Sequence, residues 1–185
     1  MTIQELERQD GLQAQSQPEQ EQVNVAGGIP GELSSIINWK LSEFVYKNGL
    51  GRVFGAQTDF RLPKTKTPRK PDVAFVSFEH LPVNTRHTVP VVPDLAVEVA
   101  SKTDDLYDIE DKALYYLKAG VSVVWLVRPV TKVLEVYQSG RRTQFLTDED
   151  EIDGGLVLPG FKLKVSDIFG QLRGGNSEDI EENET

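Results

Sequence analysis

The sequence of 185 residues contains no cysteine, which excludes disulfide bonds and cysteine-ligated zinc sites. Its only two histidines, His80 and His87, lie in a polar stretch, where we expect surface residues rather than metal ligands. No apolar run approaches the roughly 20 residues that a membrane helix needs, and no apolar segment of the signal-peptide type stands at the N-terminus. These absences together favour a cytosolic protein.

Large apolar side chains are also scarce at both ends of the chain. Residues 1–23 and 174–185 are rich in Gln, Glu and Asn, and such segments cannot bury enough apolar surface to fold. We therefore expect two disordered tails around one domain of residues 24–173. Five acids and one Arg give the first tail a charge of −4, and five acids give the second −5, which together equal the net charge of −9. The domain itself is about neutral, so strong non-specific binding of nucleic acid by the whole molecule is not expected.

A local basic cluster nevertheless stands in the proline-rich stretch LPKTKTPRK. It consists of Lys64, Lys66, Arg69 and Lys70. A run of this kind is often only a solvated loop, but its cations could also contact the phosphates of a nucleic acid. The sequence leaves both interpretations open.

Hydrophobic periodicity predicts the order of the elements. Apolar residues at three- and four-residue spacing predict helices over 31–47 and 107–119, closed by Asn48–Gly49 and Gly120, with Asp104 or Asp105 as N-cap of the second. Extended patterns predict strands within 51–62, 72–78, 91–101, 121–127 and 132–138, and 155–170 reads as a short strand and a last helical turn. This order indicates a mixed-sheet α/β or α+β domain with helices packed on the sheet.

One predicted strand, PDLAVEVAS, carries a carboxylate among its apolar residues. Side chains alternate across a strand, so Glu98 lies on the face opposite to Val97 and Val99. Burying an ionised carboxylate without a partner costs several kcal/mol. Glu98 therefore requires compensation, either in a core ion pair or in a functional site.

A second acid opens the preceding strand, in KPDVAFV. Asp72 follows a proline, where aspartate is a common turn residue. If it points to the same side of the sheet as Glu98, the two carboxylates repel each other unless a divalent cation lies between them. A ligand set of oxygen atoms favours Mg²⁺, with Mn²⁺ as the alternative.

The helix after Glu98 supplies a cation. Asp108, Lys112 and Tyr116 lie at four-residue intervals and so share one helix face. Asp108 and Lys112 also form an ordinary stabilising pair for a helix. An Asp and a Glu on successive strands, followed by a Lys that could reach back, favour a metal-dependent hydrolytic site over this simpler explanation.

These residues, together with Gly120, Val121 and Trp125, resemble the Uma2 family of predicted endonucleases, which is abundant in cyanobacteria. The resemblance covers roughly residues 25–170. It implies a PD-(D/E)XK nuclease core, a mixed sheet flanked by helices. It also implies that Asp72 and Glu98, helped by the backbone carbonyl of Val99, bind Mg²⁺, and that Glu32 on the first helix is a further acidic ligand.

The sequence departs from the wider superfamily at the lysine. Members typically place a Lys two residues after the Glu, and this chain has Ala100 there. The resemblance implies that Lys112 replaces it and orients or deprotonates the attacking water, or stabilises the transition state. Val123 and Arg128 also stand where the family often has acids, which affects local salt bridges rather than the proposed ligands.

The function implied by the resemblance is Mg²⁺-dependent hydrolysis of DNA phosphodiester bonds. The basic cluster would contact phosphates, and superfamily nucleases are often homodimers, although no residue here proves a dimer. Two alternatives stay open: a nuclease fold that has lost catalysis and serves as a DNA- or protein-binding module, and an enzyme of the same chemistry acting on RNA or another phosphodiester.

Overall fold

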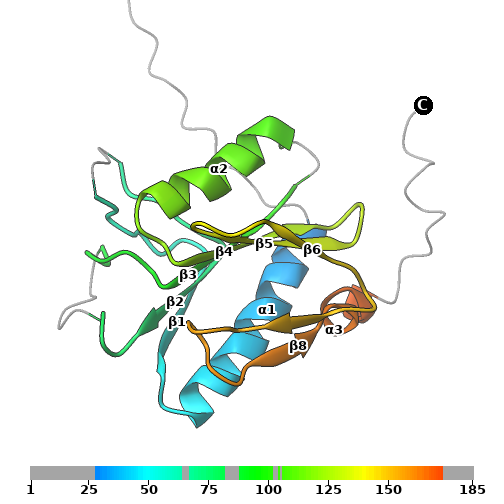
Figure 1. Cartoon of the computed structure of the whole chain (residues 1–185), viewed down its shortest axis with the longest axis horizontal. Helices are drawn as coiled ribbons and strands as arrows, with labels where there is room; N and C mark the ends of the chain where they lie inside the picture. Colours follow the sequence, from blue (N-terminus) through cyan, green and yellow to red (C-terminus); the bar gives the residue numbers. More distant parts are fainter. Residues whose placement is uncertain (1–27, 64–66, 82–87, 102–103, 105, 173–185) are drawn as a thin grey trace, which may run out of the picture.

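The structure is a computed structural model that describes residues 28–63, 67–81, 88–101, 104 and 106–172 (Figure 1). Both predicted tails lie outside the described residues, as do Lys64, Lys66 and His87. No helix in the described part of the chain is long and apolar enough to cross a membrane.

A six-stranded mixed sheet forms the centre of the domain. Its strands follow the order of the sequence: β1 (Gly51–Gly55), β2 (Val73–Ser77), β3 (Leu95–Val99), β4 (Val123–Arg128), β5 (Val133–Gln138) and β6 (Gln144–Leu146). Neighbouring strands are antiparallel except for β3 and β4, which are parallel. A parallel pair needs a crossover connection, and α2 (Leu106–Lys118) provides it. The predicted mixed sheet with helices is confirmed.

Helix α1 (Gly28–Lys47) covers one face of this sheet (Figure 1). The predicted apolar stripe is its buried side, formed by Leu33, Ile37, Leu41 and Val45. The helix ends where predicted, because Gly49 has a φ of +62°, which glycine adopts without steric cost. The side-chain amide of Asn48 also donates to the carbonyl of Phe44 at 2.8 Å.

The C-terminal segment packs on the same side of the sheet as α1. It contains the hairpin of β7 (Glu151–Asp153) and β8 (Lys162–Lys164), followed by α3 (Val165–Phe169) and a 3₁₀ turn (Gly170–Leu172). Phe161 joins the layers, since its ring stacks on Trp125 at 6.0 Å and meets the edge of Phe44 at 5.3 Å between centroids. The sequence analysis missed β6 and β7, because three-residue strands with mostly exposed side chains carry little hydrophobic pattern.

Helix α2 covers the opposite face of the sheet (Figure 1). Val97 and Val99 belong to the core under α1, whereas Ala96 packs with Ala113 and Tyr116 in the core under α2. The predicted alternation along β3 is therefore confirmed. Because Glu98 lies between Val97 and Val99, it faces α2.

Candidate active site

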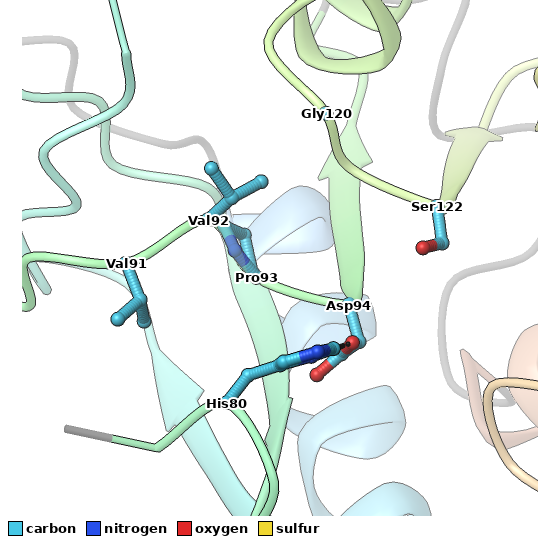
Figure 2. Close-up of a pocket in the computed structure, with 7 residues that line it drawn as sticks. All are labelled: His80, Val91, Val92, Pro93, Asp94, Gly120 and Ser122. Atoms are coloured by element: carbon cyan, nitrogen blue, oxygen red, sulfur yellow. Dashed lines mark hydrogen bonds and ion pairs between the residues drawn. The ribbon is translucent and has the colours of Figure 1, made fainter.

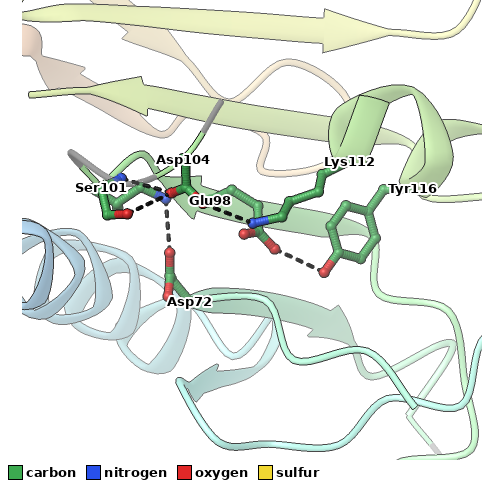
Figure 3. Close-up of polar contacts among 7 residues, drawn as sticks. Asp72, Glu98, Ser101, Asp104, Lys112 and Tyr116 are labelled. Atoms are coloured by element: carbon green, nitrogen blue, oxygen red, sulfur yellow. Dashed lines mark hydrogen bonds and ion pairs between the residues drawn. The ribbon is translucent and has the colours of Figure 1, made fainter. Parts of the chain in front are cut away.

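Asp72 and Glu98 lie at the same level of two neighbouring strands (Figure 3). The antiparallel register pairs Val73 with Val97, so the residue before Val73 is level with the residue after Val97. The strand β2 begins just after Pro71, which has no N–H to extend the ladder. At this point the N–H of Val99 donates to Oδ2 of Asp72 at 2.8 Å. The backbone of β3 thus orients the Asp72 carboxylate.

Both carboxyl groups are poorly hydrated, and each is affected by the charge of its surroundings. Glu98 is only 9% exposed. Its burial, together with the neighbouring Asp72 carboxylate, raises the pKa of Glu98 to about 7. Burial also raises the pKa of Asp72, although the Val99 N–H and the Lys112 charge oppose that increase. Two adjacent carboxylates repel each other, which favours their protonated forms. A cation between them would stabilise the ionised forms.

Tyr116 on α2 is the hydrogen-bond donor to Glu98. Its hydroxyl donates to Oε1 of Glu98 at 2.8 Å, and the side chain is 3% exposed (Figure 3). Burial and the charge of Glu98 raise the pKa of Tyr116 well above its usual value, so the hydroxyl keeps its proton. The sequence analysis placed Tyr116 on the Lys112 face but gave it no role. Its spacing of four residues from Lys112 was the available signal.

Lys112 extends from α2 toward Glu98 and Asp104 (Figure 3). Its Nζ lies 3.6 Å from Oδ1 of Asp104, and the side chain is 41% exposed. The charge of Lys112 lowers the pKa values of both Asp72 and Glu98, against the effect of burial. The amine therefore lies within electrostatic reach of the carboxylate pair, although its ion pair is with Asp104.

Asp104 connects the loop after β3 to Lys112. Its Oδ2 accepts from the N–H of Ser101 at 2.8 Å and from the Ser101 hydroxyl at 2.9 Å. Burial would raise the pKa of Asp104, but these hydrogen bonds and Lys112 outweigh it and lower the value. The described contacts of Asp104 are thus with Ser101 and Lys112, and the N-cap of α2 stays a prediction. Asp105 and the side chain of Asp108 lie outside the described part of the structure.

In the described part of the chain, Glu32, Arg69 and Lys70 form no hydrogen bond or ion pair with Asp72 or Glu98. Glu32 is exposed on α1, in the layer opposite α2, and its role as a ligand stays a prediction. The guanidinium of Arg69 lies over the ring of Tyr115 at 4.5 Å from the centroid. Nζ of Lys70 lies 3.7 Å from Oδ1 of Asp59. No group of three or more His, Asp or Glu side chains able to hold a metal occurs among the described residues. Among the residues that the structure describes, the candidate ligands are therefore the carboxylates of Asp72 and Glu98.

Arg128 on β4 forms ion pairs of its own. Its guanidinium contacts Glu135 on β5 and Glu110 on α2, the latter at 3.1 Å. Glu135 is 3% exposed and also accepts from the hydroxyl of Tyr137. This second buried acid is thus compensated by a cation, whereas Glu98 is bonded to a neutral hydroxyl.

A separate pocket of about 290 Å³ lies at the other end of β3 (Figure 2). His80 and Asp94 line it, with Nδ1 of His80 2.7 Å from Oδ1 of Asp94. The other oxygen of Asp94 accepts from the N–H of Ser77 at 2.7 Å. His80 is exposed, as predicted. Asp94 and Glu98 therefore occupy opposite ends of one strand, and the pocket is not part of the carboxylate pair.

Comparison with known proteins identifies the family. A family model named Uma2, described as "Putative restriction endonuclease", matches residues 5–166. A crystal structure of "a putative nuclease belonging to DUF820" from Anabaena variabilis ATCC 29413 is similar in fold, with a TM-score of 0.67. That similarity covers 78% of this chain and 82% of the other at 17% sequence identity.

A cryo-EM structure of a DrdV–DNA complex matches 70% of this chain and 85% of the other at 14% identity, but with a TM-score of 0.35 it carries no argument about the fold. No curated protein matches the sequence. The family model spans most of the chain, including the strands and the helix that carry Asp72, Glu98 and Lys112. The chain belongs to the Uma2 family, whose description is "Putative restriction endonuclease".

Proposed function

We propose that this protein is a Mg²⁺-dependent endonuclease that hydrolyses phosphodiester bonds of DNA. The observation that carries the proposal is the level placement of Asp72 and Glu98, with the Lys112 charge acting on both. Family membership supports a nuclease role. The requirement for Mg²⁺ and the DNA substrate go beyond family membership and are proposed here from the residues of the site.

The residues of the site fit a hard divalent cation. The side-chain donors are carboxylate oxygens, and Mg²⁺ commonly binds one or two carboxylates while water and substrate phosphates complete its shell. Asp72 and Glu98, with the backbone carbonyl of Val99, would hold Mg²⁺ or Mn²⁺. The ion would lower the pKa of a bound water and neutralise charge on the phosphate. Burial is the main cause of the raised pKa of Glu98, and a cation would relieve the repulsion from Asp72 that adds to it.

The remaining groups of the site would position the reacting water and the substrate. The Lys112 amine would orient the water or stabilise negative charge that develops on the phosphate. Asp104 would keep that amine near the carboxylates through their ion pair. Arg69, held over Tyr115, and Lys70 would contact phosphates, which positions DNA without reading its sequence. Lys64 and Lys66 would extend these contacts.

Plasmid nicking in Mg²⁺ tests the proposal directly. We expect Asp72→Ala and the isosteric Glu98→Gln to reduce the rate at least about 100-fold, because each removes a charged ligand of the ion. Glu43→Ala, an exposed acid on α1, is the matched control and should keep the wild-type rate. Circular dichroism would verify that each variant is folded.

The same assay separates the competing functions. Equal nicking by the wild type, Asp72→Ala and Glu98→Gln would contradict the proposed site. Cleavage of RNA but not of DNA under identical conditions would identify RNA as the substrate. Binding of DNA without cleavage in Mg²⁺ or in Mn²⁺ would indicate a binding module. Glu32→Ala in this assay shows whether the helix α1 acid is a ligand, as the family resemblance implies.

A further inference from the structure

We propose that Tyr116 is a positioning residue that fixes the orientation of the Glu98 carboxylate toward the divalent cation, a role that rests on the proposed metal site. The hydroxyl donates to Oε1 of Glu98 at 2.8 Å. A carboxylate that gives one oxygen to a fixed donor has lost its freedom to rotate. Figure 3 shows the other oxygen of Glu98 turned away from Tyr116.

The ring of Tyr116 is itself fixed by core packing. It belongs to the cluster under α2 that also contains Phe60, Ala96 and Ala113, and it meets the ring of Tyr115 edge-on at 6.2 Å. Helix α2 therefore aims the hydroxyl at Glu98 from a rigid position, and the same helix carries Lys112 one turn earlier. A donor built in this way holds its partner in one geometry, as supporting hydrogen bonds do around metal ligands.

The choice of a neutral donor is consistent with a cation next to Glu98. Among the described residues, a second buried acid of this face, Glu135, is paired with the Arg128 guanidinium. A guanidinium beside Glu98 would neutralise the carboxylate and repel a metal ion, whereas a phenol satisfies one oxygen and leaves the charge. Tyr116 thus compensates for the burial of Glu98 without competing with the ion.

A purely structural role makes a different prediction for metal affinity. If the hydrogen bond only satisfies a buried acid, removing it changes the stability of the fold but not the affinity of the folded protein for metal. If it positions Glu98, the affinity falls. Tyr116→Phe separates the two, because phenylalanine keeps the ring in the core and removes only the hydroxyl.

Calorimetric titration of the full chain with Mn²⁺ is the test. We expect Tyr116→Phe to weaken Mn²⁺ binding about 10- to 100-fold, the usual effect of losing a group that orients a metal ligand. Tyr137→Phe is the matched control, since it removes the hydroxyl that donates to the buried Glu135, two strands from Glu98 in the sheet. It should change the affinity by less than about twofold.

Nicking kinetics give a second readout. In Tyr116→Phe the Mg²⁺ concentration for half-maximal rate should rise by a similar factor, saturating Mg²⁺ should restore most of kcat, and KM for DNA should stay unchanged. Wild-type Mn²⁺ affinity in folded Tyr116→Phe would overturn the positioning role and leave the proposed function intact. A wild type that binds no Mn²⁺ would overturn the proposed metal site and this role with it.

A structure of the wild type with Mn²⁺ bound tests the inference without any substitution. We expect Glu98 to contact the ion through one oxygen while Tyr116 still donates to the other. A Glu98 side chain that leaves Tyr116 to reach the ion would overturn the proposal. This measurement remains decisive even if Tyr116→Phe fails to fold.

Discussion

The Glu98 carboxyl should make the metal-free protein less stable at high pH. Its pKa rises from the ordinary 4.5 to about 7 in the folded state, mainly because it is buried. Between these values the folded chain binds more protons than the unfolded chain, so the free energy of unfolding falls as pH rises. This loss in the free energy of unfolding is absent below pH 4.5 and complete above about pH 7. It amounts to about 3 kcal/mol.

Glu98→Gln isolates this effect, because glutamine has the same shape and no charge. In EDTA we expect the variant to be more stable than the wild type at about pH 8, by up to about 3 kcal/mol, and nearly equal to it at about pH 4. Urea unfolding across this range measures both curves. If the difference in free energy of unfolding between the two proteins were the same at every pH, ionised Glu98 would not be the source of the destabilisation.

Mg²⁺ should reverse the order of the two proteins at high pH. An ion that binds only the folded state raises the free energy of unfolding, and the wild type alone has both carboxylates. We expect Mg²⁺ to stabilise the wild type and to leave Glu98→Gln almost unchanged. The same titration links the stability of the fold to the candidate site.

At the scale of elements, the proposed function assigns the lysine of the site to helix α2, at Lys112, rather than to strand β3. Lys112→Ala should lower the nicking rate about 10²- to 10⁴-fold, the usual contribution of a group that handles a proton or stabilises developing charge. DNA affinity should change little. Lys118→Ala, in the last turn of the same helix, is the control. A wild-type rate in Lys112→Ala would exclude this lysine from the mechanism.

Adding Ala100→Lys to Lys112→Ala should restore part of the rate. The N–H of Ala100 donates to the carbonyl of Val127 at 2.8 Å, which continues the extended geometry of β3 past Val99. Residue 100 therefore lies on the same face as Glu98. No recovery in the double variant would show that the amine must come from α2, where Asp104 holds it.

The same elements show what sequence can and cannot predict. Alternation and helical spacing are local, so they correctly placed Glu98 on the face opposite to Val97 and Val99, and Lys112 with Tyr116 on one helix face. The pattern suggested a divalent cation between Asp72 and Glu98, and the family resemblance then implied that both are its ligands. The hydrogen bond of Tyr116 and the ion pair of Asp104 depend on rotamers and on distances between elements. No spacing rule contains that information.

At the scale of the molecule, negative charge is concentrated at the ends of the sequence. The chain has a net charge of −9, which the first 23 and last 12 residues carry entirely, since they contribute −4 and −5. In the proposed complex Arg69 and Lys70 of the neutral domain would contact DNA phosphates, which the acids of the terminal segments would repel. Repulsion between such charges and phosphates acts over about 10 Å at 0.1 M salt and less at higher salt.

Neutralising the last acidic segment in the full chain should therefore tighten DNA binding. We expect replacement of its five acids by Gln or Asn to increase the affinity for duplex DNA in EDTA about 3- to 10-fold at about 30 mM salt, because like charges no longer repel. The acids are Glu178, Asp179, Glu181, Glu182 and Glu184. Fluorescence anisotropy measures the affinity.

The salt dependence decides whether this effect is electrostatic. The gain in affinity should disappear at about 0.5 M salt, where screening leaves little interaction between the acids and the phosphates. A control variant that exchanges Glu for Asp and Asp for Glu at the same five positions keeps the charge and should bind like the wild type. Equal affinity of the neutralised chain and the wild type at low salt would mean that bound DNA lies too far from these acids for their charges to repel it.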